Sequence, residues 1–406
     1  MAYSSNERIS SRPHWARRAE TRVVRATAAF FLRLGWHKRI EPFVGYGAEP
    51  ETPTHTTPDP MRYEHAAGVV LPESTGWIRV LARVMISPKK RAALFRTSAL
   101  GQAERQRTVR GWRSFFTVQA PEALVYINVG DTTYRVHADE GGYIDVVLPA
   151  QFSAGWHEVT ITAGTAAKND SDDAAIREAE SASVGIRVIG PQATVGLVSD
   201  IDDTAIVTAL PRPMLAAWNS FVLHEEARQP VPGMSELYRK LTRRYPDLPV
   251  FYLSTGAWNV VPAMLRFFTR YRFPQGPLFM TDWGPTNTGF FRSGRVHKQH
   301  ALERLVTDFP TMKWLLSGDN GQHDPVIYRE FAHQYPQHVQ AIMIRQLSAS
   351  EAVLAHGSPT TTHANQRAEE RSHDESVTVT YVQGPDGYAL SDQLVDSGVL
   401  SEGDRP

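Results

Sequence analysis

Acidic residues crowd the end of one short apolar run in the middle of the chain. The run, residues 194–199, leads directly into Asp200, Asp202 and Thr204. An apolar run of this length suits a strand buried on both faces of a parallel sheet, and open α/β sheets bind their ligands at the carboxyl ends of such strands. Carboxylates this close repel one another unless a cation or a proton lies among them, which predicts a Mg²⁺ site with oxygen ligands.

The same residues could carry out phosphoryl transfer. With a metal bound, the carboxylate of Asp200 can attack phosphorus and form an aspartyl-phosphate. Asp202 is placed to protonate the leaving oxygen and later to activate water. A capped helix start or a solvated acidic turn would show the same few residues, so this interpretation depends on partners elsewhere in the chain.

Two further stretches offer groups that could hold a phosphate. Ser254 and Thr255 follow a second apolar run, residues 248–253, where a hydroxyl and free backbone N–H groups suit a phosphate oxygen. A simple helix N-cap would look the same. Lys298 opens a helical stretch after a cationic loop and could neutralise charge on a transferring phosphoryl group, although a surface lysine is the alternative.

A third apolar run brings two more acids. Residues 312–316 are followed by Asp319 and Asp324. If this run forms a strand beside residues 194–199, four acids converge on one cation, and the metal ligands would be Asp200, Asp202, Asp319 and Asp324. Arg292 and Arg295, in and beside the cationic loop, are our candidates for contact with the rest of the substrate.

Composition excludes several other classes of function. The chain has 406 residues, with 43 Lys and Arg balanced by 43 Asp and Glu, so a generally basic nucleic-acid footprint is absent. It has no cysteine, which rules out disulfides and thiolate nucleophiles. No apolar run is long enough to span a bilayer, and the polar start lacks a signal-peptide pattern. We therefore expect a soluble cytoplasmic protein.

The N-terminal region predicts a basic amphipathic helix over residues 16–39, after a disordered start at residues 1–15. One face would carry Val23, Thr27, Phe30, Phe31 and Leu34, and the opposite face Arg18, Arg22, Arg25 and Arg33. Such a helix, ending at residues 36–39, predicts peripheral docking on an anionic membrane surface, on the inner face of the membrane. The alternative is a helix packed on its own protein with a solvated basic face.

The rest of the chain divides into four parts. Residues 41–190 show short alternating strands separated by turn signals, which predicts a sandwich-like β domain with a structural or binding role. Residues 191–346 alternate strand and helix, which favours a three-layer α/β domain with a parallel sheet. Residues 347–376 are polar and predict disorder. Residues 377–406 predict a last strand and helix that complete the α/β domain.

These stretches resemble the haloacid dehalogenase superfamily of phosphoryl-transfer enzymes, which shows the same residue types in the same order. A narrower resemblance, over residues 190–346, is to the catalytic domain of the actin patch protein family of Mg²⁺-dependent phosphatidate phosphatases. It rests on Val231-Pro232-Gly233-Met234, Tyr252-Leu253-Ser254, Asp282-Trp283-Gly284, Gly289-Phe290-Phe291-Arg292-Ser293-Gly294, His297-Lys298 and Gly318-Asp319-Asn320-Gly321-Gln322-His323-Asp324-Pro325. Where such families have Ser-Asn or Ser-Ser after the second strand, this chain has Ser254-Thr255-Gly256.

The resemblance implies a HAD-like, Rossmann-like catalytic domain and a role for each matching residue. Asp200 would be the nucleophile and a Mg²⁺ ligand, and Asp202 the general acid and base, with its backbone carbonyl on the metal. Thr204 would stabilise the turn, and Ser254 and Lys298 would hold phosphoryl oxygens. Asp319 would bind Mg²⁺ directly. Asp324 would bind it through water or position Lys298.

Three functions remain open at this point. The first is a Mg²⁺-dependent phosphatase of phosphatidate or a related lipid phosphate. The second uses the same chemistry on a soluble phosphomonoester, with the region between the first two strands as a selective cap. The third is a binding or scaffolding protein whose phosphatase domain is inert; the presence of every expected acid, with Ser254 and Lys298, argues against it.

Overall fold

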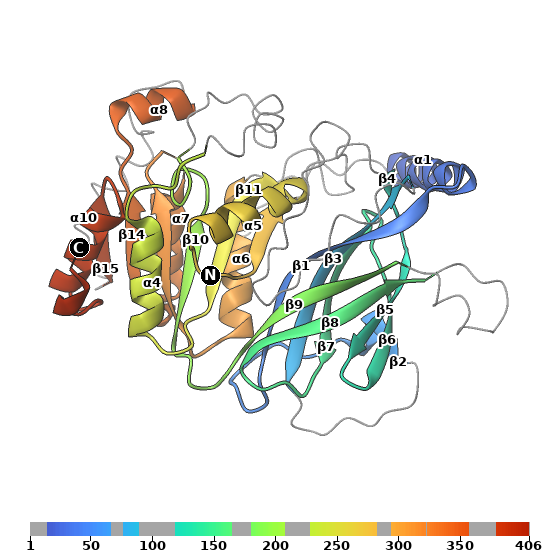
Figure 1. The fold of residues 1–406 in the computed structure, drawn as a ribbon, viewed down its shortest axis with the longest axis horizontal. Helices are drawn as coiled ribbons and strands as arrows, with labels where there is room; N and C mark the ends of the chain where they lie inside the picture. Colours follow the sequence, from blue (N-terminus) through green and yellow to red (C-terminus); the bar gives the residue numbers. More distant parts are fainter. Residues whose placement is uncertain are drawn as a thin grey trace, which may run out of the picture.

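Two sheets, with helices around them, organise the described part of the chain (Figure 1). The computed structural model describes residues 14–65, 76–88, 118–164, 180–207, 228–281, 294–321, 323–356 and 379–405. Within them no helix is long and apolar enough to cross a membrane. Residues 1–13 of the expected disordered start at 1–15 lie outside the described residues, as do residues 89–117, residues 208–227 of the expected cap and the loop 282–293. His14 and Trp15, also expected to be disordered, begin the N-terminal helix.

Sheet A joins the strands of the first half of the chain. It has nine strands among the described residues, in the order β2-β6-β5-β8-β9-β1-β3-β4, with β7 also paired to β3. Their bounds are β1 His37–Ala48, β2 Tyr63–His65, β3 Trp77–Ser87, β4 Val118–Gln119, β5 Leu124–Val129, β6 Thr132–His137, β7 Tyr143–Pro149, β8 Gly155–Ala163 and β9 Ser181–Ile189. β1 and β9 run parallel and the other pairs antiparallel.

The predicted sandwich therefore needs correction. Hydrogen bonds connect these strands into one mixed sheet that surrounds its own core, instead of two separate sheets packed face to face. Alternation of apolar residues shows which side chains are buried, but not which strand pairs with which. The parallel contact of β1 with β9 joins segments at opposite ends of this region, and no local pattern predicts it.

Sheet B is parallel throughout, in the order β12-β11-β10-β13-β14-β15. Its strands are β10 Val195–Asp200, β11 Val250–Ala257, β12 Leu278–Thr281, β13 Lys313–Asp319, β14 Val339–Arg345 and β15 Thr380–Gly384. Helices α4 (Met234–Arg244), α5 (Val261–Arg270) and α10 (Gly387–Asp396) share a core with one face. Helices α6 (Gly294–Asp308) and α7 (Asp324–Gln334) pack on the other, which gives the expected three layers.

The two sheets pack on each other through side chains of β1 and β3. Tyr46 and Trp77 of sheet A belong to the same buried cluster as Phe251 and Trp314 of sheet B. The Tyr46 hydroxyl donates to Asp308 Oδ2, at the end of α6, over 2.6 Å. The chain therefore passes from sheet A to sheet B near residue 190, but the two sheets share one buried cluster.

The N-terminal helix, α1, spans His14–Arg33 and ends earlier than the sequence predicts. Gly35 has φ +82°, the left-handed conformation that glycine adopts easily at a helix C-terminus. Its N–H donates to the carbonyl of Leu32, and the N–H of Trp36 donates to that of Phe31, which is the Schellman pattern. The chain then enters β1 at His37, so residues 37–39 belong to sheet A.

Expected disorder at 347–376 is also wrong in part. Residues Ala349–His356 form helix α8, directly after β14. Glu351 of α8 receives hydrogen bonds from Arg345 and from the N–H of Ser348, which hold the start of the helix to the sheet. Residues 357–376 lie outside the described part. β15 pairs with β14 and α10 packs on α4, so the C-terminal segment extends the α/β half.

Candidate active site

Three neighbouring strands bring the predicted residues together. β10 lies between β11 and β13, and all three run in the same direction, so their carboxyl ends share one edge of sheet B. Asp200 ends β10 and Asp319 ends β13, while Ser254 lies in β11. Every residue of β10 is buried, as the uninterrupted apolar run predicts for a central strand. The neighbouring position of the first and third predicted strands is therefore confirmed.

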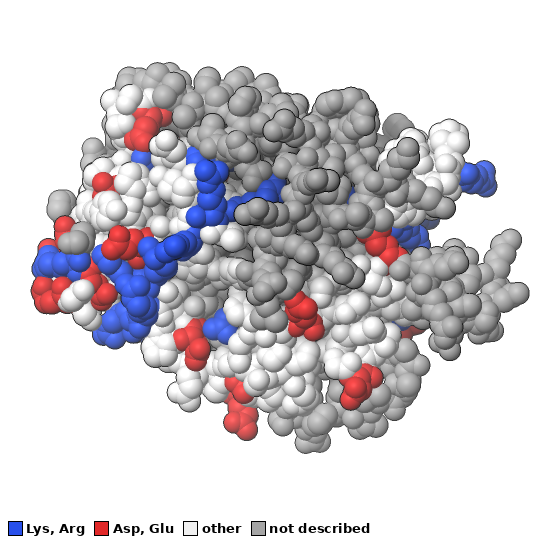
Figure 2. Space-filling view, viewed as in Figure 1, with Lys and Arg blue, Asp and Glu red and all other residues white. Residues whose placement is uncertain are grey.

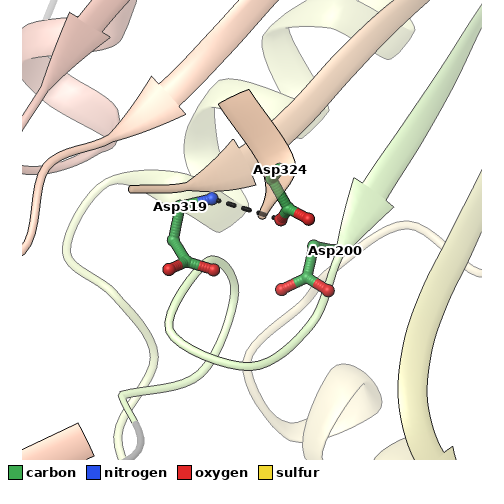
Figure 3. Close-up of side chains that lie close together, drawn as sticks. All are labelled: Asp200, Asp319 and Asp324. Atoms are coloured by element: carbon green, nitrogen blue, oxygen red, sulfur yellow. Dashed lines mark hydrogen bonds between the residues drawn. The ribbon is translucent and has the colours of Figure 1, made fainter. Parts of the chain in front are cut away.

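Three carboxyl groups face a common space at this edge (Figure 3). Asp200, Asp319 and Asp324 each place one carboxylate oxygen within 4.8 Å of the others, and all three side chains are buried. Asp319 Oδ1 accepts the N–H of Gly321 over 2.7 Å. Its Oδ2 is buried without a hydrogen-bond partner among the described residues. Mg²⁺ is a hard cation that binds oxygen ligands. A buried carboxylate oxygen without a hydrogen-bond partner, beside two more carboxylates, is suited to bind it.

Lys298 lies between two of these acids. Its Nζ is 2.6 Å from Asp200 Oδ1 and 2.5 Å from Asp324 Oδ1, and the residue is 2% exposed. The lysine is carried by the second turn of α6, and Asp324 is the first residue of α7. The surface-lysine alternative is therefore wrong. Its ammonium group is buried between the nucleophile candidate and a second acid.

Burial and mutual repulsion set the charge state of the site. Burial raises the pKa of Asp200 to about 8, although Lys298 opposes the shift, and Asp324 and Asp202 add to it. Burial, followed by repulsion from Asp324 and Asp200, raises the pKa of Asp319 well above its usual range. Burial disfavours the charged form of Lys298, but the two acids outweigh it and raise the lysine pKa. Full ionisation of the three acids would give more negative charge than one lysine neutralises, so without a further cation Asp200 and Asp319 tend to hold protons.

Asp202 and Thr204 occupy the turn after β10. Ser254 Oγ donates to Asp202 Oδ2 over 3.2 Å, so the second strand contacts the predicted acid and base. Thr204 Oγ1 donates to Asp200 Oδ2 over 3.3 Å, which ties the turn back to the predicted nucleophile. The carboxylate of Asp202 lies outside the three-acid group. Ser254 Oγ also accepts the N–H of Gly256 over 2.9 Å.

Two of the other substrate-binding candidates, Thr255 and Arg295, lie among the described residues. Thr255 follows Ser254 in β11, and its carbonyl accepts the Thr281 hydroxyl over 2.6 Å. Arg295 donates to both carboxylate oxygens of Glu330, over 2.6 and 2.7 Å, on the surface between α6 and α7. Both bonds use Nη2 of Arg295, and a role of this residue in substrate contact stays a prediction. Arg292 lies outside the described residues.

Two supporting residues escape sequence reasoning. The Tyr238 hydroxyl, from α4, donates to Ser317 Oγ over 2.8 Å and lies 2.6 Å from Ser199 Oγ, so it joins the strands that end in Asp319 and Asp200. Arg345, at the end of β14, donates to the carbonyl of Asp203 over 2.9 Å. A tyrosine within an amphipathic helix and an arginine after a strand are ordinary, so no local signal identifies either.

The segment that carries this site is similar to known proteins. Residues 195–346 match the model of a family described as the catalytic domain of phosphatidate phosphatase APP1, which confirms the narrower resemblance for that part of the chain. Phosphatidate phosphatase APP1 of Saccharomyces cerevisiae is 29% identical over 157 residues, which cover 38% of this chain and 26% of that protein. An uncharacterized protein of Schizosaccharomyces pombe is 25% identical over 154 residues, 38% of this chain and 25% of that protein. The chain thus spans about a quarter of the length of these relatives.

Solved structures add no argument about the fold. A carbohydrate acetylesterase from Xanthomonas citri matches with a TM-score of 0.22 and 12% identity, over 62% of this chain and 68% of that one. A β-glucuronidase from Parabacteroides merdae matches with a TM-score of 0.23 and 8% identity, over 77% of this chain and 34% of that one. These scores are too low to relate the architectures.

Proposed function

We propose that this protein is a Mg²⁺-dependent phosphatase of phosphatidate, built on a HAD-like α/β domain, that works through an aspartyl-phosphate on Asp200. One observation carries the proposal. Lys298 is buried between Asp200 and Asp324, with Asp319 close by, at the carboxyl edge of a parallel sheet. A cluster of buried acids with too little positive charge destabilises the folded state. Such a cluster therefore favours a role in binding a divalent cation and a phosphoryl group.

The proposed metal ligands are the side chains of Asp200, Asp319 and Asp324 together with the backbone carbonyl of Asp202. When bound, Mg²⁺ would supply positive charge that offsets repulsion between the carboxylates and the phosphate. Among these ligand atoms, Asp319 Oδ2 is buried and has no hydrogen-bond partner within the described residues. Lys298 and Ser254 would hold phosphoryl oxygens, since the side chains of both lie at this edge of the sheet, next to Asp200 and Asp202.

In the first proposed step, a carboxylate oxygen of Asp200 attacks phosphorus. The bond from phosphorus to the glycerol oxygen breaks, and Asp202 gives its proton to that oxygen, so diacylglycerol leaves as an alcohol. Thr204 and Lys298 hold the Asp200 carboxylate through one oxygen each, which limits its rotation. Such positioning accounts for much of the catalysis in phosphoryl transfer.

In the second proposed step, water attacks the phosphorus of the aspartyl-phosphate. Asp202, now a carboxylate, takes a proton from that water, and the bond between phosphorus and the Asp200 oxygen breaks. Inorganic phosphate leaves and both aspartates return to their starting state. The Ser254 hydroxyl, which donates to Asp202 Oδ2, fixes the direction of the group that moves the proton in both steps.

Phosphatidate is proposed because both the matched family and the yeast relative carry that activity in their names. A cytoplasmic protein attached to the inner membrane face would meet this lipid, and we include that location in the proposal. A soluble phosphomonoester would need the same catalytic groups, so the choice between substrates has to come from assay.

The experiment measures phosphate release from phosphatidate in mixed micelles and from p-nitrophenyl phosphate, with Mg²⁺ and with EDTA. Asp200→Asn tests the nucleophile, and Asp131→Asn, at an exposed turn after β5, is the matched control. We expect Mg²⁺-dependent release from the lipid that falls by at least about a thousandfold in Asp200→Asn and stays unchanged in Asp131→Asn.

Two results would change the proposal. Release from the small ester alone would keep the mechanism and replace the lipid by a soluble substrate. No release from either, with Mg²⁺ bound by the folded protein, would favour the inert scaffold.

A further inference from the structure

Helix α1 carries an exposed row of apolar side chains. Val23, Phe30 and Leu34 are 66%, 57% and 59% exposed. Positions 23, 30 and 34 recur at whole turns of a helix, so these three side chains project from one side. Leu34 follows directly after the last helical residue. Scattered exposed apolar residues are ordinary, but a row of three large ones along one helix needs an explanation.

A different side of the same helix already packs on the protein. Ala28 is buried in the core of sheet A, and Phe31 packs against that core. The Phe31 ring lies 4.3 Å from that of Trp36, centroid to centroid, as part of the turn that ends the helix. Arg25 forms an ion pair with Glu122, which lies between β4 and β5. The single apolar face predicted from sequence is therefore divided, and the row of Val23, Phe30 and Leu34 remains outward.

Positive charge lies beside this row. Arg22 and Arg33 are exposed, and the helical spacing places them on the flank opposite the buried Ala28. From residue 21 to residue 40 the sequence contains no Asp or Glu. In Figure 2, Lys and Arg side chains border uncharged surface at the end of the molecule where Figure 1 places α1. An apolar row with arginines alongside matches the chemistry of an anionic bilayer surface.

From these observations we infer that α1 docks on anionic membrane, with Val23, Phe30 and Leu34 inserted at the level of the headgroups and Arg22 and Arg33 against lipid phosphates. The packed flank fixes the orientation of the helix, so the protein would dock as one body. In Figure 1, α1 and the carboxyl edge of sheet B, which leads into α8, both lie toward the upper side of the view. Docking through α1 would hold that edge near the bilayer.

The test separates this surface from the catalytic site by its choice of lipid. The full chain is mixed with phosphatidylcholine vesicles that contain phosphatidylglycerol, whose phosphate is a diester and so is not a phosphatase substrate. Binding is measured by flotation in Mg²⁺-free buffer. The variants are Val23→Ser/Phe30→Ser/Leu34→Ser and Arg22→Gln/Arg33→Gln. The control is Met61→Ser, which removes a 91% exposed apolar side chain from another part of the surface.

We expect binding to the anionic vesicles that is weak on phosphatidylcholine alone. Each variant should lower the partition coefficient by about tenfold or more, since the arginines contribute by attraction to anionic lipid and the apolar side chains through buried area. Met61→Ser should bind as the parent does. Hydrolysis of p-nitrophenyl phosphate should stay unchanged in every variant, because none of these residues touches the site.

Three results would overturn the inference. The first is failure of the parent chain to bind anionic vesicles, and the second is equal binding after the apolar row has been removed. A concentration-dependent dimer that the apolar variant abolishes, without vesicle binding, would instead assign the row to a second copy of this chain. Failure of the catalytic proposal would leave the flotation result standing, because the assay contains no substrate.

Discussion

Arg345 donates from Nη1 to the backbone carbonyl oxygen of Asp203 over 2.9 Å. Asp203 lies between the proposed acid and base, Asp202, and Thr204, and its φ of +58° is in the left-handed region. The same guanidinium donates from Nε to the carbonyl of Pro385 and from Nη2 to Glu351. One buried side chain thus holds the turn after β10, α8 and the segment after β15 together.

The first prediction concerns this guanidinium. Arg345→Lys keeps the charge but cannot reach three acceptors in a planar fork, so the turn that carries Asp202 should loosen. We expect kcat for p-nitrophenyl phosphate to fall by about tenfold or more with little change in KM, and the free energy of unfolding to fall by about 1.5–3 kcal/mol. Steady-state kinetics and urea denaturation measure the two effects.

Arg187→Lys is the matched control for Arg345→Lys. Arg187 also donates to backbone carbonyls, those of Val188 and Asp247, but it lies in β9 of sheet A. It should lose stability without a change in kcat. Equal losses of kcat in the two variants would show that Arg345 acts through general stability and not through the turn.

The second prediction concerns metal and pH. Because burial raises the pKa of Asp200 to about 8 in the metal-free protein, above about 3.9 in the unfolded chain, the folded state holds this proton more tightly. The resulting stabilisation is present below about pH 4 and is lost as pH rises toward 8. Mg²⁺ should replace the proton, so the Mg²⁺-induced rise in Tm should be larger at pH 8 than at pH 5.5.

At 100 times its Kd, Mg²⁺ should add about 2.7 kcal/mol to the free energy of unfolding. Differential scanning calorimetry at matched ionic strength gives the Tm values. Asp319→Asn should reduce the shift at both pH values, because it removes the charge of a proposed ligand. A Mg²⁺ effect that is independent of pH, or that survives Asp319→Asn unchanged, would argue against a metal among these acids.

The sequence predicts the residues that would carry out the chemistry more completely than the residues that hold them in place. Asp200 and Asp319 are predicted because each follows an apolar run, and parallel strands end at one edge. The contact of Lys298 with Asp200 and Asp324 depends on how α6 and α7 pack on sheet B, which no spacing specifies. Arg345 ends an apolar strand, and an arginine at such a position usually reaches solvent. Only the packing of α8 and the turn after β15 makes it internal.

The fold divides in a similar way. Buried parallel strands show in the sequence as continuous apolar runs, so β10, β11 and β13 are predicted, and a late strand is expected where β15 lies. The four-residue edge strand β12 is not predicted. In sheet A, alternation indicates strands but leaves their pairing open, and long-range partners such as β1 and β9 decide that one sheet forms. The end of α1 was predictable from Gly35, because glycine is the usual residue just after a helix. The longer helix was expected because the aromatic and basic residues 36–39 suit the end of a membrane-facing helix.

The third prediction uses a glycine beside the acids. A Cβ at Gly318 would lie 2.6 Å from Asp324 Oδ2 and 2.7 Å from its Cβ, closer than such atoms approach. Gly318→Ala should therefore displace Asp324 and weaken its contact with Lys298. We expect Mg²⁺ affinity, measured by calorimetric titration, to fall about 10–100-fold, the range typical for residues that orient metal ligands.

Gly403→Ala is the matched control, since nothing lies within 4 Å of a Cβ built there. It should bind Mg²⁺ as the parent does. If Gly318→Ala also binds Mg²⁺ normally while it remains folded, Asp324 is not a metal ligand, and its role reduces to holding Lys298.

The last prediction concerns the packing between the two sheets. Asp308 is 1% exposed at the end of α6, where the helix dipole disfavours a negative charge, and it accepts hydrogen bonds from Tyr46, Thr56 and Arg79 of the sheet A half. Tyr46→Phe removes one donor to a buried charge and should cost about 1.5–3 kcal/mol. Since both sheets share a core, guanidinium denaturation should remain a single transition with a lower midpoint.

Tyr134→Phe is the control. The Tyr134 hydroxyl donates to the carbonyl of Pro149 inside sheet A, so its loss should cost less, about 1 kcal/mol. Two separate transitions in the parent chain, followed by fluorescence and by circular dichroism, would mean that the sheets fold independently and that Tyr46 only joins two finished domains.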